Sequence, residues 1–266
     1  MTYEGKVVVL TGASVGIGRA LALELAAQRP RLVLAARDEA RLQQVAEECR
    51  ARGAEALVAR TDVTVQDECR TLVERALARF DRIDALVLNA GMSMWARFDE
   101  VQDLTLFESL MRVNYFGCVW LTHFVLPELK RTRGQIVAVA SLAGLTGVPT
   151  RTGYAASKHA LVGFCDSLRI ELEPDGVDVT VVAPDFVVSE IHRRALGPEG
   201  QPLGESPMQE ARIMSTDDCA RMIRRAMEGR KRLVVGSLRG RFGRWARLLA
   251  PAVVDRIARR AVERGR

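Results

Sequence analysis

The sequence lacks any long apolar run, which argues against a membrane-spanning protein. No run of 18 or more apolar residues occurs in the 266-residue chain, whereas a helix that crosses a bilayer needs about 20. The first residues, MTYEGKVVVL, also lack the basic start and the small-residue cleavage site of a signal peptide. We therefore expect a cytoplasmic protein.

Residues that form disulfides or bind metals are few. The chain has three histidines without ligand-like spacing, and its five cysteines are scattered, with no CxxC pair. An odd number of scattered cysteines is typical of reduced thiols rather than of a disulfide framework or a zinc site. We expect no metal site.

The charge is unevenly distributed along the chain. Residues 1–220 carry 24 Lys and Arg against 30 Asp and Glu, whereas residues 221–266 carry 15 against 3. A basic end can bind nucleic acid or an anionic membrane, or it can be a solvated arginine surface. The arginines form no recognisable groove-reading motif, so we expect no nucleic-acid partner.

Short apolar segments alternate with helical patterns along most of the chain. Continuous apolar segments are typical of parallel strands buried on both faces. The strand candidates, several of which are apolar throughout, lie at 7–12, 31–37, 55–63, 83–91, 134–141, 178–184 and 232–237. Helical patterns lie between them, at 17–29, 38–52, 66–80, 104–130, 154–172 and 216–229. This βαβ order predicts a single α/β domain over residues 1–238, a doubly wound parallel seven-stranded sheet (Rossmann fold) with helices on both faces.

The first strand leads into a glycine-rich turn, TGASVGIG, before a helix. In a doubly wound sheet the pyrophosphate of a dinucleotide lies on this turn, because glycines let it approach the backbone. The spacing is GxxxGxG rather than the GxGxxG of the general fingerprint. The expected cofactor contacts are Gly12, Ser14, Gly16, Ile17 and Gly18.

The ends of the next two strands indicate which dinucleotide binds. Ala36 offers no carboxylate to the ribose hydroxyls, whereas the planar guanidinium of Arg37 suits a 2′-phosphate, so NADP(H) is favoured over NAD(H). Asp38 could turn outward or compete with that phosphate. Asp62 and Val63 end the third strand, where the Asp62 carboxylate either accepts from the adenine amino group or caps a turn.

Five motifs in this order resemble the short-chain dehydrogenase/reductase family. They are TGASVGIG, the NAG of Asn89, Ala90 and Gly91, then Asn114, Ser141, and the YxxxK of Tyr154 and Lys158. The resemblance is collinear from about residue 5 to 237. The neighbourhoods of Ser141 and Tyr154, with the basic C-terminal segment, are similar in particular to the 11β-hydroxysteroid dehydrogenase-like branch.

The resemblance implies hydride transfer between a nicotinamide and a carbonyl or alcohol carbon. A carbonyl that accepts a hydride becomes an alkoxide and needs a proton. Four-residue spacing places Tyr154 and Lys158 on one helix face. Tyr154 would be the acid/base, and the Lys158 ammonium would stabilise its phenolate and bind the nicotinamide ribose.

Two further residues complete the implied catalytic set. Ser141 ends the fifth strand, where ligands bind in such folds, and its hydroxyl would hold the substrate oxygen. Asn114 would help to hold a water that links Lys158 to solvent. Taken alone, each residue could instead make an ordinary helix contact. Asn89, Ala90 and Gly91 would shape the turn beneath the cofactor.

The segment after the sixth strand departs from the family pattern. Pro184 is kept, but Asp185 stands where the family has Gly, and Ser189 where it has Thr. Ser189 keeps the hydroxyl expected at the nicotinamide carboxamide, beside Pro184 and Val187. Asp185 would be strained if the backbone there has positive φ. Its carboxylate would favour the oxidised, positively charged cofactor.

The Pro- and Gly-rich segment 185–215 is predicted to be a substrate loop over a mostly apolar pocket. We expect His192 in this loop to be exposed rather than a pocket donor, and we expect no arginine cluster beyond Arg193 and Arg194. The candidate pocket residues are Phe186, Val187, Val188, Ile191, Met208 and Met214 of the loop, with Met92, Met94, Trp95, Leu142, Leu145 and Val148.

These patterns predict an NADP(H)-dependent alcohol dehydrogenase or ketoreductase that acts on an apolar, steroid- or lipid-like carbonyl or alcohol. The alternatives are a 3-oxoacyl-carrier-protein reductase and a non-catalytic dinucleotide-binding sensor or scaffold. The family suggests a homodimer or homotetramer. Residues 239–266 predict a basic amphipathic segment that either makes peripheral membrane contact or packs on a partner subunit, or is solvated.

Overall fold

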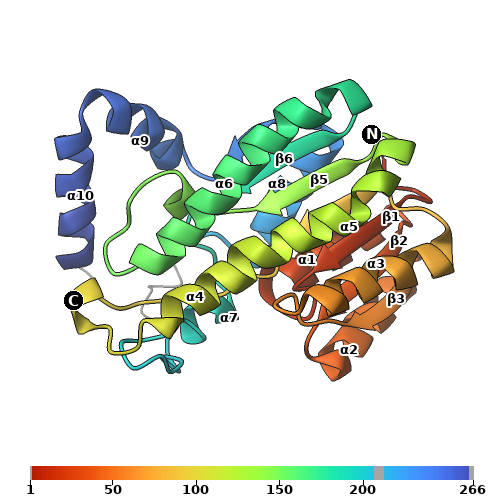
Figure 1. The fold of residues 1–266 in the computed structure, drawn as a ribbon, viewed down its shortest axis with the longest axis horizontal. Helices are drawn as coiled ribbons and strands as arrows, with labels where there is room; N and C mark the ends of the chain where they lie inside the picture. Colours follow the sequence, from red (N-terminus) through yellow and green to blue (C-terminus); the bar gives the residue numbers. More distant parts are fainter. Residues whose placement is uncertain (1, 207–212, 264–266) are drawn as a thin grey trace.

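The computed structural model describes residues 2–206 and 213–263, and its framework is one parallel sheet (Figure 1). The strands follow the order β3-β2-β1-β4-β5-β6-β7, so the order reverses between β1 and β4. A doubly wound sheet binds its ligands at such a reversal, outside the carboxyl ends of the strands. The strands are β1 (Val7–Thr11), β2 (Arg31–Ala36), β3 (Glu55–Arg60), β4 (Ala85–Leu88), β5 (Gln135–Val139), β6 (Asp178–Ala183) and β7 (Leu233–Val235).

Helices cover both faces of the sheet, as the alternation of apolar segments predicts. The core on one face contains α1 (Gly16–Ala26), α2 (Glu39–Ala51) and α8 (Thr216–Glu228). The core on the other contains α3 (Gln66–Phe80), α5 (Gly117–Thr132) and α6 (Thr152–Leu172). Both sides of β1 are fully buried, which explains why this strand is apolar throughout. The predicted seven-stranded Rossmann fold is confirmed.

The predicted helix 104–130 is interrupted. It consists of α4 (Thr105–Met111), a π-helical turn (Arg112–Phe116) and α5. Asn114 lies in the π turn with its side chain fully buried. A π turn contains one more residue than an α turn and often marks a functional position. The apolar periodicity of the sequence does not reveal this π turn, because the residues before and after it are helical. Short 3₁₀ turns lie at Phe98–Glu100, Leu142–Gly144 and Glu173–Asp175.

Two C-terminal helices form a hairpin beside the loop between β5 and α6 (Figure 1). They are α9 (Leu238–Leu249) and α10 (Pro251–Glu263); the short α7 is Glu190–Arg193. The Ser237 hydroxyl accepts from the Gly240 amide at 3.1 Å and so caps α9, and Arg247 donates to the Leu145 carbonyl at 2.8 Å. None of the described helices is long and apolar enough to cross a membrane. The division at residue 238 stays a prediction.

Candidate active site

A cavity of about 1690 Å³ opens at the carboxyl ends of the strands. It brings together almost every residue predicted from the motifs. Its walls include Gly12, Ser14, Gly16, Ile17, Gly18, Arg37, Asp62, Val63, Asn89, Ala90, Gly91, Ser141, Tyr154, Lys158, Pro184, Val187 and Ser189. Asn114 is not among the lining residues and lies buried behind this wall. Within the described residues, no cluster of His, Cys, Asp or Glu could hold a metal ion.

The glycine turn is too tight for side chains at two of its glycines. A Cβ at Gly18 would lie 2.1 Å from the Gly12 carbonyl oxygen, and one at Gly12 would lie 2.9 Å from the Ala90 Cα. Gly12 also has a φ of +65°, which favours glycine. Asn89 Nδ2 donates to the carbonyls of Thr11 and Gly12 at 2.9 and 3.2 Å. Asn89 therefore holds the turn in shape, and the exposed backbone beyond it fits a pyrophosphate.

The charged residues after β2 and β3 have different surroundings. Asp38 accepts from the Arg41 amide at 3.0 Å, so it caps α2, and it pairs with the Arg41 guanidinium at 3.2 Å. The exposed Arg37 makes no ion pair within the described part of the chain. The Asp62 carboxylate accepts from the amide and the hydroxyl of Thr64 at 2.9 and 2.8 Å, the turn-capping contact.

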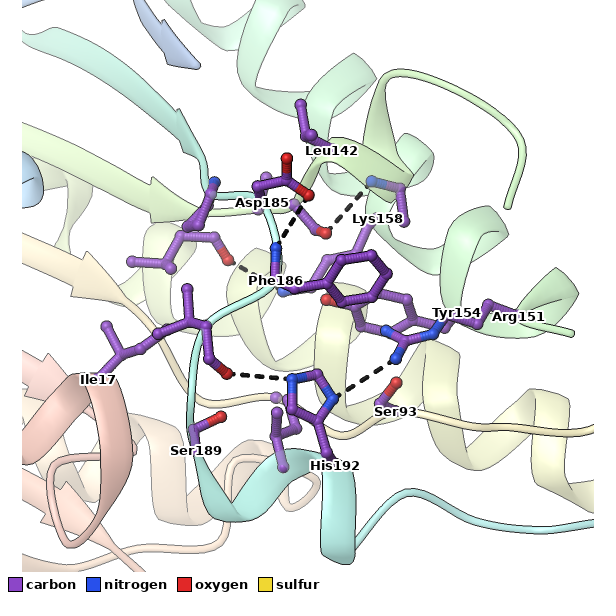
Figure 2. A pocket seen from close by; sticks show the side chains of 18 of the residues that line it. Ile17, Ser93, Leu142, Arg151, Tyr154, Lys158, Asp185, Phe186, Ser189 and His192 are labelled. Atoms are coloured by element: carbon purple, nitrogen blue, oxygen red, sulfur yellow. Dashed lines mark hydrogen bonds between the residues drawn. The ribbon is translucent and has the colours of Figure 1, made fainter. Parts of the chain in front are cut away.

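Tyr154 and Lys158 lie one turn apart on α6, and both are almost fully buried. Lys158 Nζ donates to the Val139 carbonyl at 2.9 Å (Figure 2). No carboxylate pairs with this ammonium in the described residues. Its charge therefore stays available to a phenolate or a ribose hydroxyl. Ser141 Oγ accepts from the Ala143 amide at 3.2 Å and lines the same cavity.

The Asn114 carboxamide is held by three hydrogen bonds. It accepts from the Met92 amide and donates to the Met92 carbonyl, both at 2.9 Å, and it donates to Ser157 Oγ at 2.9 Å. A Cβ at Gly91 would lie 3.1 Å from Asn114 Oδ1 and 3.7 Å from Lys158 Nζ. Asn114 is thus a rigid neighbour of Lys158. The implied water link stays a prediction.

The segment after β6 contains Asp185 and Ser189, the two departures from the family pattern. Asp185 is not among the residues with positive φ, so the expected strain is absent. Its carboxylate accepts from the Phe186 amide at 3.0 Å and from the Ser237 hydroxyl at 2.7 Å. Ser189 Oγ is buried and has no hydrogen-bond partner among residues 2–206 and 213–263. A buried hydroxyl in that state fits a cofactor carboxamide, which would satisfy it.

Most of the predicted apolar pocket residues line the cavity. Those that do are Met92, Trp95, Leu142, Leu145, Val148, Phe186, Val187, Ile191 and Met214, whereas Met94 and Val188 do not. Met208 lies outside the described residues. Residues of α9 and α10 add Phe242, Gly243, Ala246, Val253, Val254, Ile257 and Ala258, which the loop pattern did not indicate.

The expectation for His192 is wrong, because its side chain is only 4 % exposed and lines the cavity. Its Nε2 lies 3.0 Å from the Val187 carbonyl and its Nδ1 lies 3.4 Å from Arg151 Nη2 (Figure 2). Arg151, which no sequence motif indicates, is also 4 % exposed and lines the cavity. The available signal was a bulky charged residue three positions before Tyr154, in a stretch of otherwise small residues.

A model of the short chain dehydrogenase family matches residues 6–198. The chain belongs to this family. It is 37 % identical over 261 residues to 11-beta-hydroxysteroid dehydrogenase A of Sesamum indicum, covering 96 % of this chain and 75 % of the relative. It is 45 % identical over 185 residues to 11-beta-hydroxysteroid dehydrogenase-like 4A of Arabidopsis thaliana, covering 69 % of this chain and 62 % of that relative. The predicted branch is therefore confirmed.

Two solved structures share the fold of this short-chain dehydrogenase. One is a Burkholderia phymatum short chain dehydrogenase/reductase in complex with NAD, with a TM-score of 0.77 and 27 % identity over 88 % of this chain and 90 % of that one. The other is an alcohol dehydrogenase from Thermococcus sibiricus complexed with 5-hydroxy-NADP, with a TM-score of 0.74 and 28 % identity over 87 % and 94 %. The predicted enzyme class, an alcohol dehydrogenase or ketoreductase with a nicotinamide cofactor, is that of the family.

Proposed function

We propose that this chain reduces a carbonyl, or oxidises the corresponding secondary alcohol, on an apolar substrate with NADP(H) as the cofactor. The observation that carries the proposal is the buried pair of Tyr154 and Lys158 on the wall of a cavity that also contains the glycine turn. A protein that only binds a dinucleotide needs the glycine turn. It does not need a phenol beside a buried ammonium, because it transfers no proton.

The protein residues would supply everything except the hydride, which the reduced nicotinamide supplies when bound. The Ser141 hydroxyl would donate a hydrogen bond to the carbonyl oxygen and hold it against Tyr154. The phenol would deliver its proton as negative charge develops on that oxygen. The Lys158 ammonium would stabilise the phenolate left behind, and Ser189 would bind the carboxamide through its buried hydroxyl.

The preference for NADP(H) rests on the end of β2. Arg37 lines the cavity without an ion pair in the described residues, whereas the Asp38 carboxylate is held by Arg41. A guanidinium without a carboxylate partner suits a 2′-phosphate, and a carboxylate already engaged competes weakly for ribose hydroxyls.

The apolar nature of the substrate rests on the remaining wall. Leu142, Val148 and Phe186 line the same cavity as Tyr154, and α9 and α10 add Phe242 and Ile257. Burial of apolar surface would contribute roughly 25 cal/mol per Å² to binding of a hydrophobic skeleton. We also propose a homodimer or homotetramer. We propose peripheral membrane contact through residues 239–266, because apolar side chains of α9 are exposed.

The decisive experiment compares the wild type with Tyr154→Phe. We expect NADPH oxidation with a panel of apolar ketones, and a loss of kcat by a factor of roughly 10²–10⁴ in the variant, because the proton donor is removed. NADPH binding, followed by the fluorescence of the dihydronicotinamide, should stay unchanged. Equal turnover by both proteins would refute the role of Tyr154.

The same panel separates the two alternatives. A sensor or scaffold would bind NADPH and turn over no ketone in either form. A 3-oxoacyl-carrier-protein reductase would prefer 3-oxoacyl thioesters over simple ketones of the same chain length. It would also need a basic surface to dock the acidic carrier.

A further inference from the structure

Arg151 is a buried cation that no carboxylate of the described residues neutralises. Its side chain is 4 % exposed, and no carboxylate forms an ion pair with it in the described residues. Its Nε is buried, and no group in the described part of the chain forms a hydrogen bond with it. Charged side chains are almost never this buried unless they are paired.

The neighbours of the guanidinium hold it in place without neutralising it. Its carbon lies 4.3 Å from the ring centre of Trp95, 5.1 Å from that of Phe186 and 5.7 Å from that of Tyr154. Aromatic faces attract a cation, but they accept none of its five N–H hydrogens as a carboxylate would. Figure 2 shows the guanidinium beside the rings of Phe186 and Tyr154 and next to His192.

His192 does not supply a negative charge that would neutralise the Arg151 guanidinium. Its Nε2 lies 3.0 Å from the Val187 carbonyl, which can only accept, so Nε2 carries a hydrogen. Its Nδ1, 3.4 Å from Arg151 Nη2, then accepts from the guanidinium. His192 therefore orients Arg151 and leaves its positive charge intact.

Arg151 stays protonated despite this environment. Burial lowers the pKa of its guanidinium to about 10, and the charge of Tyr154 partly opposes that decrease. At neutral pH the group is still charged. An unpaired ion in an apolar cavity is costly, and the cost disappears when an oxyanion binds with two parallel hydrogen bonds.

The position of Arg151 relative to Tyr154 indicates what would bring that oxyanion. Arg151 immediately precedes the first residue of α6, three residues ahead of Tyr154, and both side chains line the same cavity. A ligand whose carbonyl lies at Tyr154 would extend past the guanidinium along the walls of Trp95 and Phe186. The acidic group and the reacting carbonyl would thus belong to one molecule.

We propose that Arg151 binds a carboxylate of the substrate, so that the enzyme acts on oxo or hydroxy acids with an apolar skeleton. This inference rests on the proposed function, because it names the substrate class of the same site. It adds a specificity residue that binds the end of the substrate that does not react.

The test uses oxodecanoic acids with the ketone at successive carbons, each beside its methyl ester. We expect at least one acid to exceed its ester by tenfold or more in kcat/KM. In Arg151→Met this ratio should fall close to one, chiefly through a higher KM for the acid. Arg151→Lys should retain part of the preference, since it keeps the charge but loses the planar fork.

Arg194→Met is the matched control, because Arg194 also borders the cavity but is half exposed and pairs with Glu190. It should leave the acid-to-ester ratio unchanged. An unchanged ratio in Arg151→Met would overturn the proposal. The proposal would also be overturned if Arg151→Met lowered kcat/KM equally for acids and esters and shifted the pH dependence of kcat. Arg151 would then act through Tyr154.

A binding measurement separates this proposal from the proposed function. Octanoate should raise the melting temperature of the wild type and of Arg194→Met, and octanol should raise that of Arg151→Met more than octanoate does. These shifts need no turnover, so they test the anion site even if no ketone is reduced. A wild type that responds equally to octanoate and octanol would refute the site.

The stability of the variant guards against a folding artefact. Replacing a buried unpaired ion by an apolar side chain of similar length removes a desolvation cost. The urea midpoint of Arg151→Met without ligand should therefore be equal to or higher than that of the wild type. A clear decrease would instead assign Arg151 a structural role and count against the proposal.

Discussion

Arg37 and Asp38, at the end of β2, bring opposite charges to one corner of the cavity. The carboxylate is held by α2 and Arg41, whereas the guanidinium is not paired within the described residues. Arg37→Ala should therefore lower kcat/KM for NADPH by roughly ten- to a hundredfold, since a charged hydrogen bond contributes about 1.5–3 kcal/mol. The value for NADH should change little, and steady-state kinetics with both cofactors gives the comparison.

The control for Arg37→Ala is Arg70→Ala, which removes an exposed arginine of α3 that pairs with Asp67. The ratio of kcat/KM for NADPH to kcat/KM for NADH should be the same in Arg70→Ala as in the wild type. If Arg37→Ala weakens both cofactors equally, the guanidinium acts on a part common to both, and the 2′-phosphate assignment fails.

Single residues were predictable where their chemistry follows from position along the chain. Gly12, Ser141, Tyr154 and Lys158 each occupy a fixed place after a strand or on a helix face, and the fold brings them together. His192 and Arg151 were not predictable in this way. Their burial depends on contacts with each other and with aromatic rings far along the chain, and a charged residue in a loop is expected to be exposed.

At the scale of elements, a carboxylate joins the two central strands. Asp84 precedes β4 and accepts from the Val7 amide of β1 at 2.9 Å, while Arg82 and Lys6 pair with it at 2.6 and 3.3 Å. Its side chain is 8 % exposed. Asp84→Asn should therefore lower the free energy of unfolding by about 1–3 kcal/mol at pH 7, because the buried Val7 amide and the partly exposed Arg82 and Lys6 lose a charged acceptor. Urea denaturation measures the loss.

The same contact predicts a dependence on pH. Burial alone would raise the pKa of the Asp84 carboxyl, but the hydrogen bonds from Arg82 and Val7 and the charge of Lys6 lower it below its ordinary value. A lowered pKa in the folded state stabilises the protein above the unfolded value of about 3.9, and this contribution is lost as the pH falls through the folded value. The difference between wild type and Asp84→Asn should thus shrink below about pH 4. A constant difference from pH 7 down to pH 3.5 would contradict this account.

Elements were predictable to the extent that their periodicity is local. All seven strands occur where continuous apolar segments predict them, although they end one to three residues earlier, because the residues that follow already turn into the cavity wall. The π turn at Arg112–Phe116 was not predictable. The turn contains Asn114, whose side chain forms hydrogen bonds with the Met92 backbone, and no pattern within the helix reveals this contact.

At the scale of the whole molecule, the helical hairpin of α9 and α10 has one side on the cavity and another facing outward (Figure 1). Three apolar residues of α9 that do not line the cavity share one helix face by their spacing, and they are 59–85 % exposed: Leu238, Trp245 and Leu249. Exposed arginines lie on the same hairpin, among them Arg241 of α9 and Arg256 of α10. An exposed apolar stripe with basic neighbours is typical of helices that lie on anionic membranes.

We therefore predict salt-sensitive binding to anionic vesicles, directed by α9. The full chain should co-sediment with phosphatidylserine vesicles at about 0.1 M salt, and less at about 0.5 M, because the Debye length shortens. It should not bind vesicles of phosphatidylcholine alone. The double variant Leu238→Ser/Leu249→Ser should lose much of the binding, since both side chains belong to the exposed stripe of α9.

The control is Ile170→Ser, which removes an exposed apolar side chain of α6 and should leave vesicle binding unchanged. Sedimentation velocity of the same variants decides between a membrane and a second subunit. If the wild type is a dimer that the double serine variant separates, while vesicle binding is weak in both, the stripe of α9 is a subunit contact. The open end of the cavity would then face a second copy of the chain, because α9 and α10 form part of its wall.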